Sequence, residues 1–422
     1  MEHKIKPALA VLALTMGAGE ASAAGFGLSE QNASGLGNAF AGAAAVAEDA
    51  STIYFNPAGL SFLDGGQVVL GVDYIKPSIK FSDNGNSSSP PIITAPSGNG
   101  GNAGKDVVVP DVYISIPIGS VTIGIGANAP FGLEDEYDGN FIGRFQGLKS
   151  DLTTYNINPT VAWKVTPRFS VGAGVNYQHI DVELTNSFVG GVNTEFLSRL
   201  KGNDDGWGWN VGAMFQVSDD MRLGASYRSK INYSIEGNAT LTTPAGASVL
   251  NTPAHADLTV PDMASISVFQ KFDERWDLLG DITWTHWSEI DTLNIVQNST
   301  GTTLQSIKLG LDDAWRISFG LNYHLSSAWT LKSGVAWDQS PVKDQFRDVR
   351  LPDADRYWLS VGAKWRPSNK FWVDVGYAHL FVKNASINQT QAGTTPPFTS
   401  NTVAGSYDNS VDILGAQLTY QF

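Results

Sequence analysis

From about residue 66 to the end of the chain, apolar and polar residues alternate with a period of two, and no stretch has the 3.6-residue period of an amphipathic helix. The C-terminal stretch is the clearest case. One of its faces carries Leu414, Ala416, Leu418, Tyr420 and Phe422. Residues 371–377 alternate in the same way. The pattern predicts β-strands, but a soluble sandwich and a membrane barrel both show it.

The connections between these stretches are alternately short and long. Short polar turns are indicated near residues 119–120, 166–168, 218–220, 273–275, 326–327 and 367–369. Long polar stretches separate them at about residues 82–106, 132–150, 188–205, 237–254, 293–304, 340–353 and 388–406. Thirteen connections predict fourteen strands, and an even strand number with short turns on one side is typical of a bacterial outer-membrane barrel. We therefore expect an all-β fold, an antiparallel transmembrane barrel over residues 66–422.

Composition supports a membrane location without transmembrane helices. Charged residues make up 16% of the 422 residues, below the roughly 25% of soluble domains. Aromatic residues reach 11%, which fits a barrel whose Trp and Tyr side chains form interfacial girdles. The mean hydropathy of −0.10 argues against a bundle of transmembrane helices, since each needs about 20 apolar residues in a row.

Charge and residue chemistry exclude several other classes of protein. The net charge of −14 leaves no basic surface to neutralise nucleic-acid phosphates. There is no cysteine, which excludes disulfides and thiol nucleophiles. The 6 histidines lack the HxxxH and HExxH spacings of metal enzymes, and no G-x-S-x-G motif is present. We therefore expect no enzyme, no catalytic residue, no cofactor and no metal.

The N-terminus has the features of a secretory signal peptide over residues 1–23. Lys4 and Lys6 supply positive charge, residues 8–16 form a short apolar segment, and Ala-Ser-Ala at residues 21–23 fits a cleavage site. The alternative, a signal anchor, would need a longer apolar segment to cross the bilayer. We expect export and then insertion into the outer membrane.

Residues 24–65 break the strand pattern, because small residues dominate from residue 33 to residue 50. A barrel of about fourteen strands is wider than the eight-stranded barrels that side chains can fill. We therefore expect this segment to form a plug, or hatch, inside the lumen. The adjacent carboxylates Glu48 and Asp49 are interpreted as a solvated or capping pair, because neighbouring helical residues do not face each other.

Several short motifs resemble the outer-membrane long-chain fatty acid transporter (FadL) family. In the N-terminal segment they are GFGLSE at 25–30, SGLGNAFAG at 34–42, EDA at 48–50 and NPAGL at 56–60. Further along the chain they are NAPFGL at 128–133, RF at 144–145, SP at 340–341, PD at 352–353 and DRYW at 355–358. The motifs occur in the family's order. The resemblance implies a fourteen-stranded barrel with an N-terminal hatch that takes up hydrophobic molecules and releases them sideways into the membrane.

The resemblance also implies roles for two groups of residues. Those assigned to the hatch and its gating are Phe26, Asn56, Pro57 and Ala58, and those assigned to a lateral opening at a kinked third strand are Asn128, Pro130, Phe131 and Gly132. From the residues alone, Asn56, Pro57 and Ala58 of the first group also fit an ordinary Asn-Pro turn. The second also fits a strand that simply ends at Ala127, because proline interrupts a ladder.

Family members carry basic lumen residues that face the fatty acid carboxylate. The corresponding positions fall near Asn186, which is not basic, and at Ile307 or Lys308, where a one-residue shift changes the face. Lys308 is thus the one candidate carboxylate partner. Burial of a methylene contributes roughly 0.8 kcal/mol, against about 0–1 kcal/mol for a hydrated ion pair, so the apolar tail dominates affinity.

The main functional hypothesis is uptake of long-chain fatty acids or similar hydrophobic compounds. An aromatic or alkane hydrocarbon channel of the same family is the alternative, and a general porin and an outer-membrane hydrolase are weaker ones. The expected partners are the hydrophobic small molecule, outer-membrane lipid, and the barrel assembly machinery, for which the terminal Phe422 resembles a signal.

Overall fold

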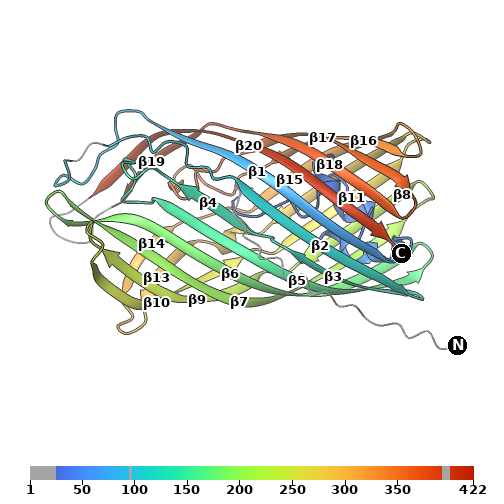
Figure 1. Ribbon diagram of the computed structural model, residues 1–422, viewed down its shortest axis with the longest axis horizontal. Helices are drawn as coiled ribbons and strands as arrows, with labels where there is room; N and C mark the ends of the chain where they lie inside the picture. The colour runs from blue at the N-terminus through green and yellow to red at the C-terminus, as the bar shows by residue number, and fades with distance from the viewer. Residues whose placement is uncertain (1–24, 95–96, 392–399) are drawn as a thin grey trace.

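The computed structural model describes residues 25–94, 97–391 and 400–422. The signal-peptide prediction for residues 1–23 lies outside these residues. Within them, no helix is long and apolar enough to cross a bilayer. The described chain is dominated by one tilted antiparallel sheet that closes on itself (Figure 1).

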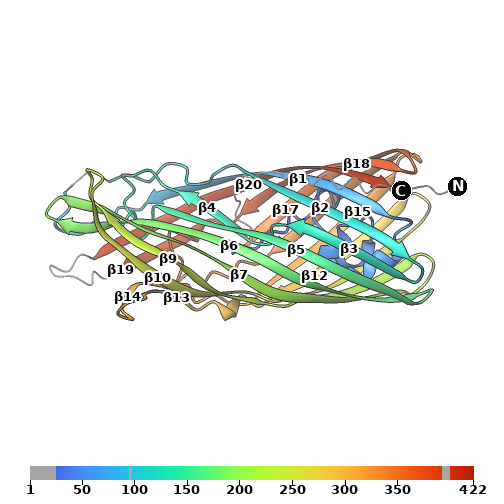
Figure 2. The same cartoon turned by 60° about the horizontal axis from the view of Figure 1, so that its bottom comes forward.

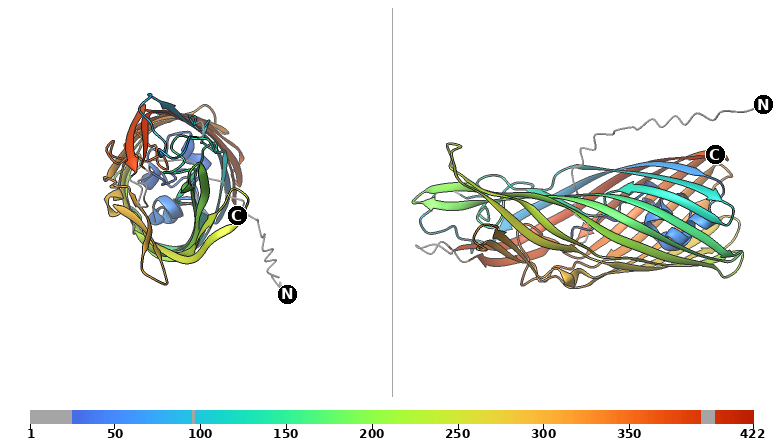
Figure 3. Two further views of the ribbon diagram at one scale, coloured as in Figure 1. Left: turned by 90° about the vertical axis from the view of Figure 1, so that its left-hand side faces the viewer. Right: turned by 90° about the horizontal axis from the view of Figure 1, so that it is seen from below.

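The segment before the sheet contains four short helices, all inside the barrel at the end that also holds the C-terminus (Figures 1 and 3). They are α1 (Ala33–Leu36), α2 (Ala43–Val46), α3 (Thr52–Phe55) and η1 (Pro57–Phe62). Each is short because small residues and turn formers recur within a few positions, and three described non-glycine residues here have positive φ: Ala39, Phe40 and Ala47. Such backbone persists only where the surroundings hold it.

The wall is made of twenty strand segments among the described residues. They are β1 (Gln67–Asp83), β2 (Val107–Ile118), β3 (Val121–Asn128), β4 (Gly132–Glu136), β5 (Lys149–Thr166), β6 (Phe169–Gly191), β7 (Thr194–Gln216), β8 (Met221–Arg228), β9 (Ile231–Thr242), β10 (Ser248–Val260), β11 (Met263–Lys271), β12 (Trp276–Thr285), β13 (Thr292–Gln297), β14 (Thr303–Lys308), β15 (Ala314–His324), β16 (Trp329–Asp338), β17 (Arg356–Ser368), β18 (Phe371–Val382), β19 (Ala385–Gln391) and β20 (Asn401–Gln421). A further short helix, η2 (Trp287–Glu289), follows β12.

Six breaks divide single wall strands into two segments. They separate β3 from β4, β8 from β9, β10 from β11, β12 from β13, β14 from β15, and β18 from β19. The twenty described segments therefore make fourteen crossings of the wall. The first and last crossings pair along all 17 residues of β1, from Gln67↔Gln421 to Asp83↔Gly405, which closes the barrel. The prediction of a fourteen-stranded antiparallel barrel is confirmed.

The six predicted short turns lie where expected, but three predicted long loops are wrong. β6 and β7 run 23 residues each and pair up to Gly191↔Thr194, so residues 188–205 form strand rather than loop. Residues 237–254 and 293–304 are likewise mostly hairpin, in β9–β10 and β13–β14. In these parts both faces of the sheet are rich in polar residues, so the alternation that marks a half-buried strand is weak. Figure 2 shows these hairpins extending the wall at the end opposite the helices.

The wall reverses its polarity along β6. Near the helices its inward residues include Ser170 and Asn176, both buried, while Val175 on the outer face is 47% exposed. Beyond Tyr177 the polar and apolar faces are exchanged: His179 faces outward, and Ile180 faces inward and is fully buried. The barrel thus has an apolar belt outside at one level and an apolar lining inside at the next.

Candidate functional site

The third wall strand is interrupted at the Asn-Ala-Pro-Phe-Gly motif. β3 ends at Asn128 and β4 begins at Gly132. The ladder between β2 and β3 stops at Val112↔Ala127, whereas β5 continues to pair with both halves of the interrupted strand. Pro130 has no N–H to donate, so a ladder cannot run through it unbroken. The result is a break in the pairing of the second and third crossings.

The first described residues of the chain pair with this break from inside the barrel. The Gly132 N–H donates to the Phe26 carbonyl at 2.8 Å, and the Leu28 N–H donates to the Pro130 carbonyl at 2.9 Å. Gly27 and Phe131 form an antiparallel bridge. We call residues 25–31 the arm. The arm therefore pairs, as a short inner strand, with the segment where the third crossing is interrupted.

Three aromatic rings meet beside the arm. Phe26 lies 4.8 Å from Trp287 and 6.0 Å from Phe131, between ring centroids, and Phe131 lies 6.3 Å from Trp287. All three rings are buried. Gly25 has a φ of +65°, and a Cβ there would lie 2.9 Å from the Trp287 ring, so only glycine fits. Its N–H donates to Asp353 Oδ2 at 3.0 Å, which fixes the start of the arm to a long loop.

An apolar cavity of about 930 Å³, including its open mouth, lies on the long-loop side of the aromatic cluster. Its apolar lining comprises Phe26, Leu133, Leu152, Val182, Leu184, Leu200, Ile235, Leu258, Leu293, Ile295, Ile307, Leu309 and Leu351. Phe26 and Leu133 place the arm and the resumed third strand at its boundary. The lining belongs to the level of the wall where the inner face is apolar.

A second, more polar cavity of about 780 Å³ lies on the hatch side of the cluster. Its lining includes Leu28, Tyr54 and Phe55 from the segment before the sheet, and Asp281 and Arg316 from the wall. Phe26 lines the first cavity, whereas Gly27 and Trp287 line the second. The aromatic cluster therefore stands between the two cavities.

The Asn56-Pro57-Ala58 motif joins a local turn to the wall. Asn56 Oδ1 accepts from the Ala58 N–H at 3.0 Å, which is the Asn-Pro turn that the sequence allows. Its Nδ2 also donates to the carbonyls of Ala44 at 2.7 Å and Ala213 at 3.1 Å. A Cβ at Gly212 would lie 2.0 Å from Asn56 Oδ1, so this strand needs glycine where the motif docks. The local turn and the docking on the wall are thus parts of one arrangement.

The interpretation of Glu48 as a solvated or capping residue is wrong, whereas Asp49 does accept from the nearby Ser51 N–H at 2.9 Å. Glu48 pairs with Lys332 at 2.9 Å and with Lys364, and Lys332 also donates to Asp374 at 2.9 Å. Burial alone would raise the pKa of Glu48, but the two lysine charges outweigh it and lower the pKa to about 2. Spacing along the chain carries no signal for this pairing, since the two lysines lie 284 and 316 residues after Glu48.

Gln31, which no sequence motif marks, fixes the arm to the third crossing. It accepts from Asn128 Nδ2 at 2.7 Å and donates to the Ala129 carbonyl at 2.8 Å. Tyr113 of β2 donates to its carbonyl at 2.8 Å. The neighbouring Glu30 is 2% exposed, and burial raises its pKa to about 7. The arm thus carries one buried acid that titrates near neutrality.

Lys308, the candidate carboxylate partner, is exposed and pairs with Asp291. Its neighbour Ile307 lines the apolar cavity instead. Asn186 is buried and donates to the Ser187 carbonyl at 3.0 Å. A cation that the sequence does not indicate, Arg350, lines the cavity and is 4% exposed.

The Arg350 guanidinium is held by carbonyl groups of the wall. It donates to the Lys149 carbonyl at 2.8 Å and to the Thr185 carbonyl at 2.9 Å. Burial lowers its pKa, but an arginine stays charged at any physiological pH. The cavity therefore has a buried, fixed positive group, from the loop that follows β16, among mostly apolar side chains, while a second lining cation, Lys201, is exposed.

Comparison with known proteins places these features in context. The family model described as "Outer membrane protein transport protein (OMPP1/FadL/TodX)" matches residues 14–422. Outer membrane protein P1 of Haemophilus influenzae is 31% identical over 99% of this chain and 100% of its own length. The long-chain fatty acid transport protein of Escherichia coli is 29% identical over 91% of this chain and 93% of its own.

Two solved structures have the same architecture. A Pseudomonas aeruginosa FadL homologue superposes with a TM-score of 0.87 at 25% identity, covering 94% of this chain and all of that chain. The Ralstonia pickettii toluene transporter TbuX superposes with a TM-score of 0.68 at 18% identity, covering 93% of this chain and 98% of that chain. The second similarity concerns the fold alone.

Proposed function

Because the chain belongs to the OMPP1/FadL/TodX family of outer-membrane transport proteins, we propose that it takes up long-chain fatty acids or similar hydrophobic compounds. The observation that carries this proposal is the apolar cavity of about 930 Å³ that adjoins a break in the wall. Its lining is almost entirely apolar and includes residues of the arm and of the resumed third strand, which suits a hydrocarbon ligand. The relatives are transport proteins, and the proposal requires no catalytic step.

Affinity in such a cavity comes from the hydrocarbon tail. Sixteen carbons would contribute about 12 kcal/mol gross at roughly 0.8 kcal/mol per methylene. The cavity presents Arg350 at its boundary as a partner for a carboxylate, while Lys308 lies outside its lining. A charged head group is therefore expected to set the orientation of the ligand, and the tail to set its affinity.

We place the exit at the interrupted third strand. The arm has to leave Phe131 and Gly132 before the cavity can continue to the break, because its backbone pairs with both residues. Beyond the break the ligand would meet the lipid that surrounds the barrel. An apolar tail gains nothing from an aqueous exit when lipid is adjacent. Outer-membrane lipid is thus the proposed acceptor.

A Gly132→Trp variant tests this route. The indole would fill the break and lower the rate of labelled oleate uptake at least tenfold, while the heat-modifiable barrel forms normally. Gly139→Trp, in an exposed turn with nothing within 4 Å of the added Cβ and no positive φ, is the matched control. Uptake at the wild-type rate by a well-folded Gly132→Trp protein would refute the lateral exit.

Hydrocarbon uptake is the second candidate, and the position of Lys308 favours it, since the one predicted carboxylate partner does not line the cavity. Purified protein should be tested for binding of oleate and of hexadecane or toluene. An Arg350→Met variant that weakens oleate binding about fivefold and leaves hydrocarbon binding unchanged would support fatty acids. Equal binding of all ligands by both proteins would support hydrocarbons.

Assembly of the barrel supplies a further proposed partner. Phe422 directly follows β20, is 54% exposed and lies 6.5 Å from Tyr420, between ring centroids. We infer that this exposed aromatic end is the signal for the barrel assembly machinery. A Phe422→Ala chain should therefore accumulate in the periplasm more than a Phe272→Ala chain, which loses a similarly exposed phenylalanine in a turn.

A further inference from the structure

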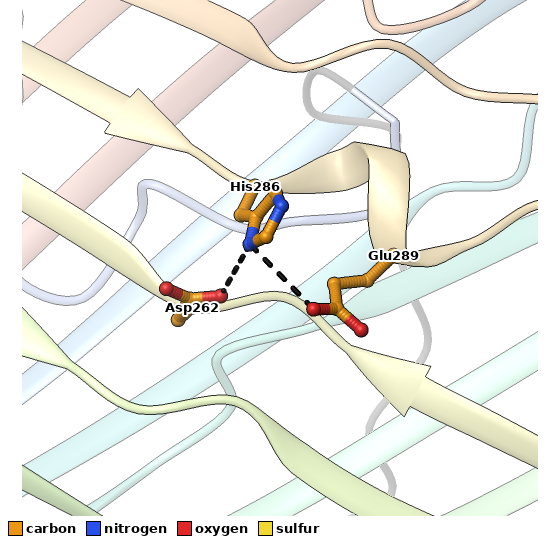
Figure 4. A group of neighbouring side chains, drawn as sticks. All are labelled: Asp262, His286 and Glu289. Atoms are coloured by element: carbon orange, nitrogen blue, oxygen red, sulfur yellow. Dashed lines mark hydrogen bonds and ion pairs between the residues drawn. The ribbon is translucent and has the colours of Figure 1, made fainter.

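Three possible ligand groups meet where two neighbouring wall strands are interrupted (Figure 4). Asp262 lies between β10 and β11, His286 follows β12, and Glu289 ends η2. The two breaks are joined by the His286 N–H, which donates to the Asp262 carbonyl at 3.0 Å. The breaks thus bring side chains from both strands to one point.

These groups belong to the outer face of the barrel. Asp262 continues the row that includes Ile266, which is 67% exposed, and His286 continues the row of Ile282, which is 47% exposed. Alternate residues of a strand share a face. The side chains of His286 and Glu289 are 33% and 28% exposed, and that of Asp262 is 10% exposed. The cluster is open to small ions from outside, and none of its three residues lines the apolar cavity.

The distances match a tetrahedral metal site. His286 Nδ1 lies 3.0 Å from Asp262 Oδ1 and 3.7 Å from Glu289 Oε1. All three atoms lie within 4.8 Å of one another. Metal bonds of about 2.0–2.1 Å in a tetrahedron separate neighbouring ligand atoms by about 3.3–3.4 Å. A small rotation of Glu289 would bring the three atoms to that spacing.

Neighbouring groups hold two of the ligands in place. Tyr227 donates its hydroxyl to Asp262 Oδ2 at 2.9 Å, which leaves Oδ1 directed at His286. The His286 ring stacks on Trp284 with centroids 5.1 Å apart. Outer contacts that orient ligands are a regular feature of metal sites. Lys230, at 2.9 Å from Glu289 Oε1, competes for the third ligand, and its side chain is 43% exposed.

We propose that Asp262 Oδ1, His286 Nδ1 and Glu289 Oε1 bind a divalent transition-metal ion of the zinc type. One imidazole nitrogen with two carboxylates suits such ions, whereas calcium and magnesium prefer oxygen ligands alone. Binding removes a proton from His286 Nδ1 and displaces Lys230 from Glu289. The ion would tie the interrupted strands β10–β11 and β12–β13 together across their breaks.

A second histidine provides a matched control. His179 also has two carboxylate neighbours, Asp205 at 2.8 Å and Asp181 at 3.2 Å. They contact opposite ring nitrogens, Nδ1 and Nε2, so a single ion cannot take both carboxylates and one ring nitrogen there. The two clusters have similar residue types and differ in geometry.

Zinc titration of the purified mature barrel, treated with chelator and carrying no polyhistidine tag, tests the proposal. Calorimetry should show one saturable site in the wild type and in His179→Ala. The affinity should fall at least tenfold in His286→Ala and in Glu289→Gln, and rise severalfold in Lys230→Met. Magnesium at the same concentrations should give no saturation.

Two outcomes would overturn the site. One is equal zinc affinity in the wild type and a His286→Ala protein whose heat-modifiable mobility shows a folded barrel. The other is an absence of saturable binding in the wild type and in Lys230→Met alike. Because the readout is metal binding alone, the result is independent of whether fatty acids are transported.

Discussion

Two parts of the segment inside the lumen are fastened in different ways. The arm, residues 25–31, contacts the third crossing through two backbone hydrogen bonds, the side chain of Gln31 and the aromatic cluster. The hatch body, residues 33–62, is held by buried charges and by motifs that dock on glycines of the wall. The difference suggests that a ligand displaces the arm while the body stays in place.

The energetics support this division. Docking of the body includes Glu48 between two lysines, where loss of one partner leaves a buried charge uncompensated. Apart from the bond of Gly25 to the Asp353 carboxylate, the hydrogen bonds described for the arm are neutral, each worth about 0.5–1.5 kcal/mol net. Burial of a sixteen-carbon tail, about 12 kcal/mol gross, can offset the cost of releasing the arm. We therefore propose that the aromatic cluster between the cavities is the part of the plug that a ligand opens.

The largest expected effect is on the body. In Glu48→Ala, Lys332 and Lys364 would share the single buried carboxylate of Asp374, and docking of the body should weaken by about 3 kcal/mol. We expect sensitivity to polar antibiotics to rise and the thermal midpoint to fall. Glu274→Ala, in an exposed turn, should change neither. Wild-type permeability in Glu48→Ala would show that the body does not depend on these charges.

The pH dependence of the arm should be nearly as large. The pKa of Glu30 is about 7 with the arm docked, against an ordinary value of 4.5 in water. A raised carboxyl pKa means that the docked state binds the proton more tightly, so docking is strongest below about pH 4.5 and weakens as pH rises through 7. The total change is about 3 kcal/mol, at 1.36 kcal/mol per pKa unit.

Hydrogen exchange of residues 25–31, measured between pH 5 and pH 8 after correction for intrinsic rates, would show this change as reduced protection at the higher pH. A Glu30→Gln protein should show protection that is flat over the same range. If the wild type and Glu30→Gln have the same slope, Glu30 does not control docking of the arm.

The smallest effect is expected at the aromatic cluster. Phe26→Leu keeps most of the apolar area but loses the ring contacts with Trp287 and Phe131, worth about 0.5–1.5 kcal/mol. The arm should open up to about tenfold more often, and Trp287 fluorescence should respond to ligand at a lower concentration. Phe381→Leu, on the outer face, is the control. An unchanged ligand response would place the barrier elsewhere.

The strand count could be predicted from the sequence because it depends on local turn chemistry. Ser-Asp-Asp at 218–220 and Pro-Ser-Asn at 367–369 mark ends of strands whatever surrounds them. The extent of the strands could not, since β6 and β7 continue for several residues where both faces are polar. Period-two patterning is informative only where one side of a sheet is buried.

Site residues with a local chemical signature could likewise be predicted, whereas those defined by distant partners could not. Pro130 could be found because proline is chemically unfit for a ladder, and Asn56-Pro57 because the pair defines a turn. Trp287 could not be told from the girdle tryptophans, and Arg350 and Glu48 have partners from distant strands. The Asp262–His286–Glu289 cluster is spread over two strand breaks, so no short motif could reveal it.

The reversal of wall polarity beyond Tyr177 bears on how a hydrophobic solute crosses the polar surface of a bacterium. β6 has 23 residues, which at about 3.3 Å per residue and a tilt of about 40° rise some 58 Å. The apolar outer belt of such barrels is only about 25 Å tall. The remainder extends beyond the belt as a tube with a polar outer face and an apolar lining, in which the solute can partition out of water before it reaches the bilayer.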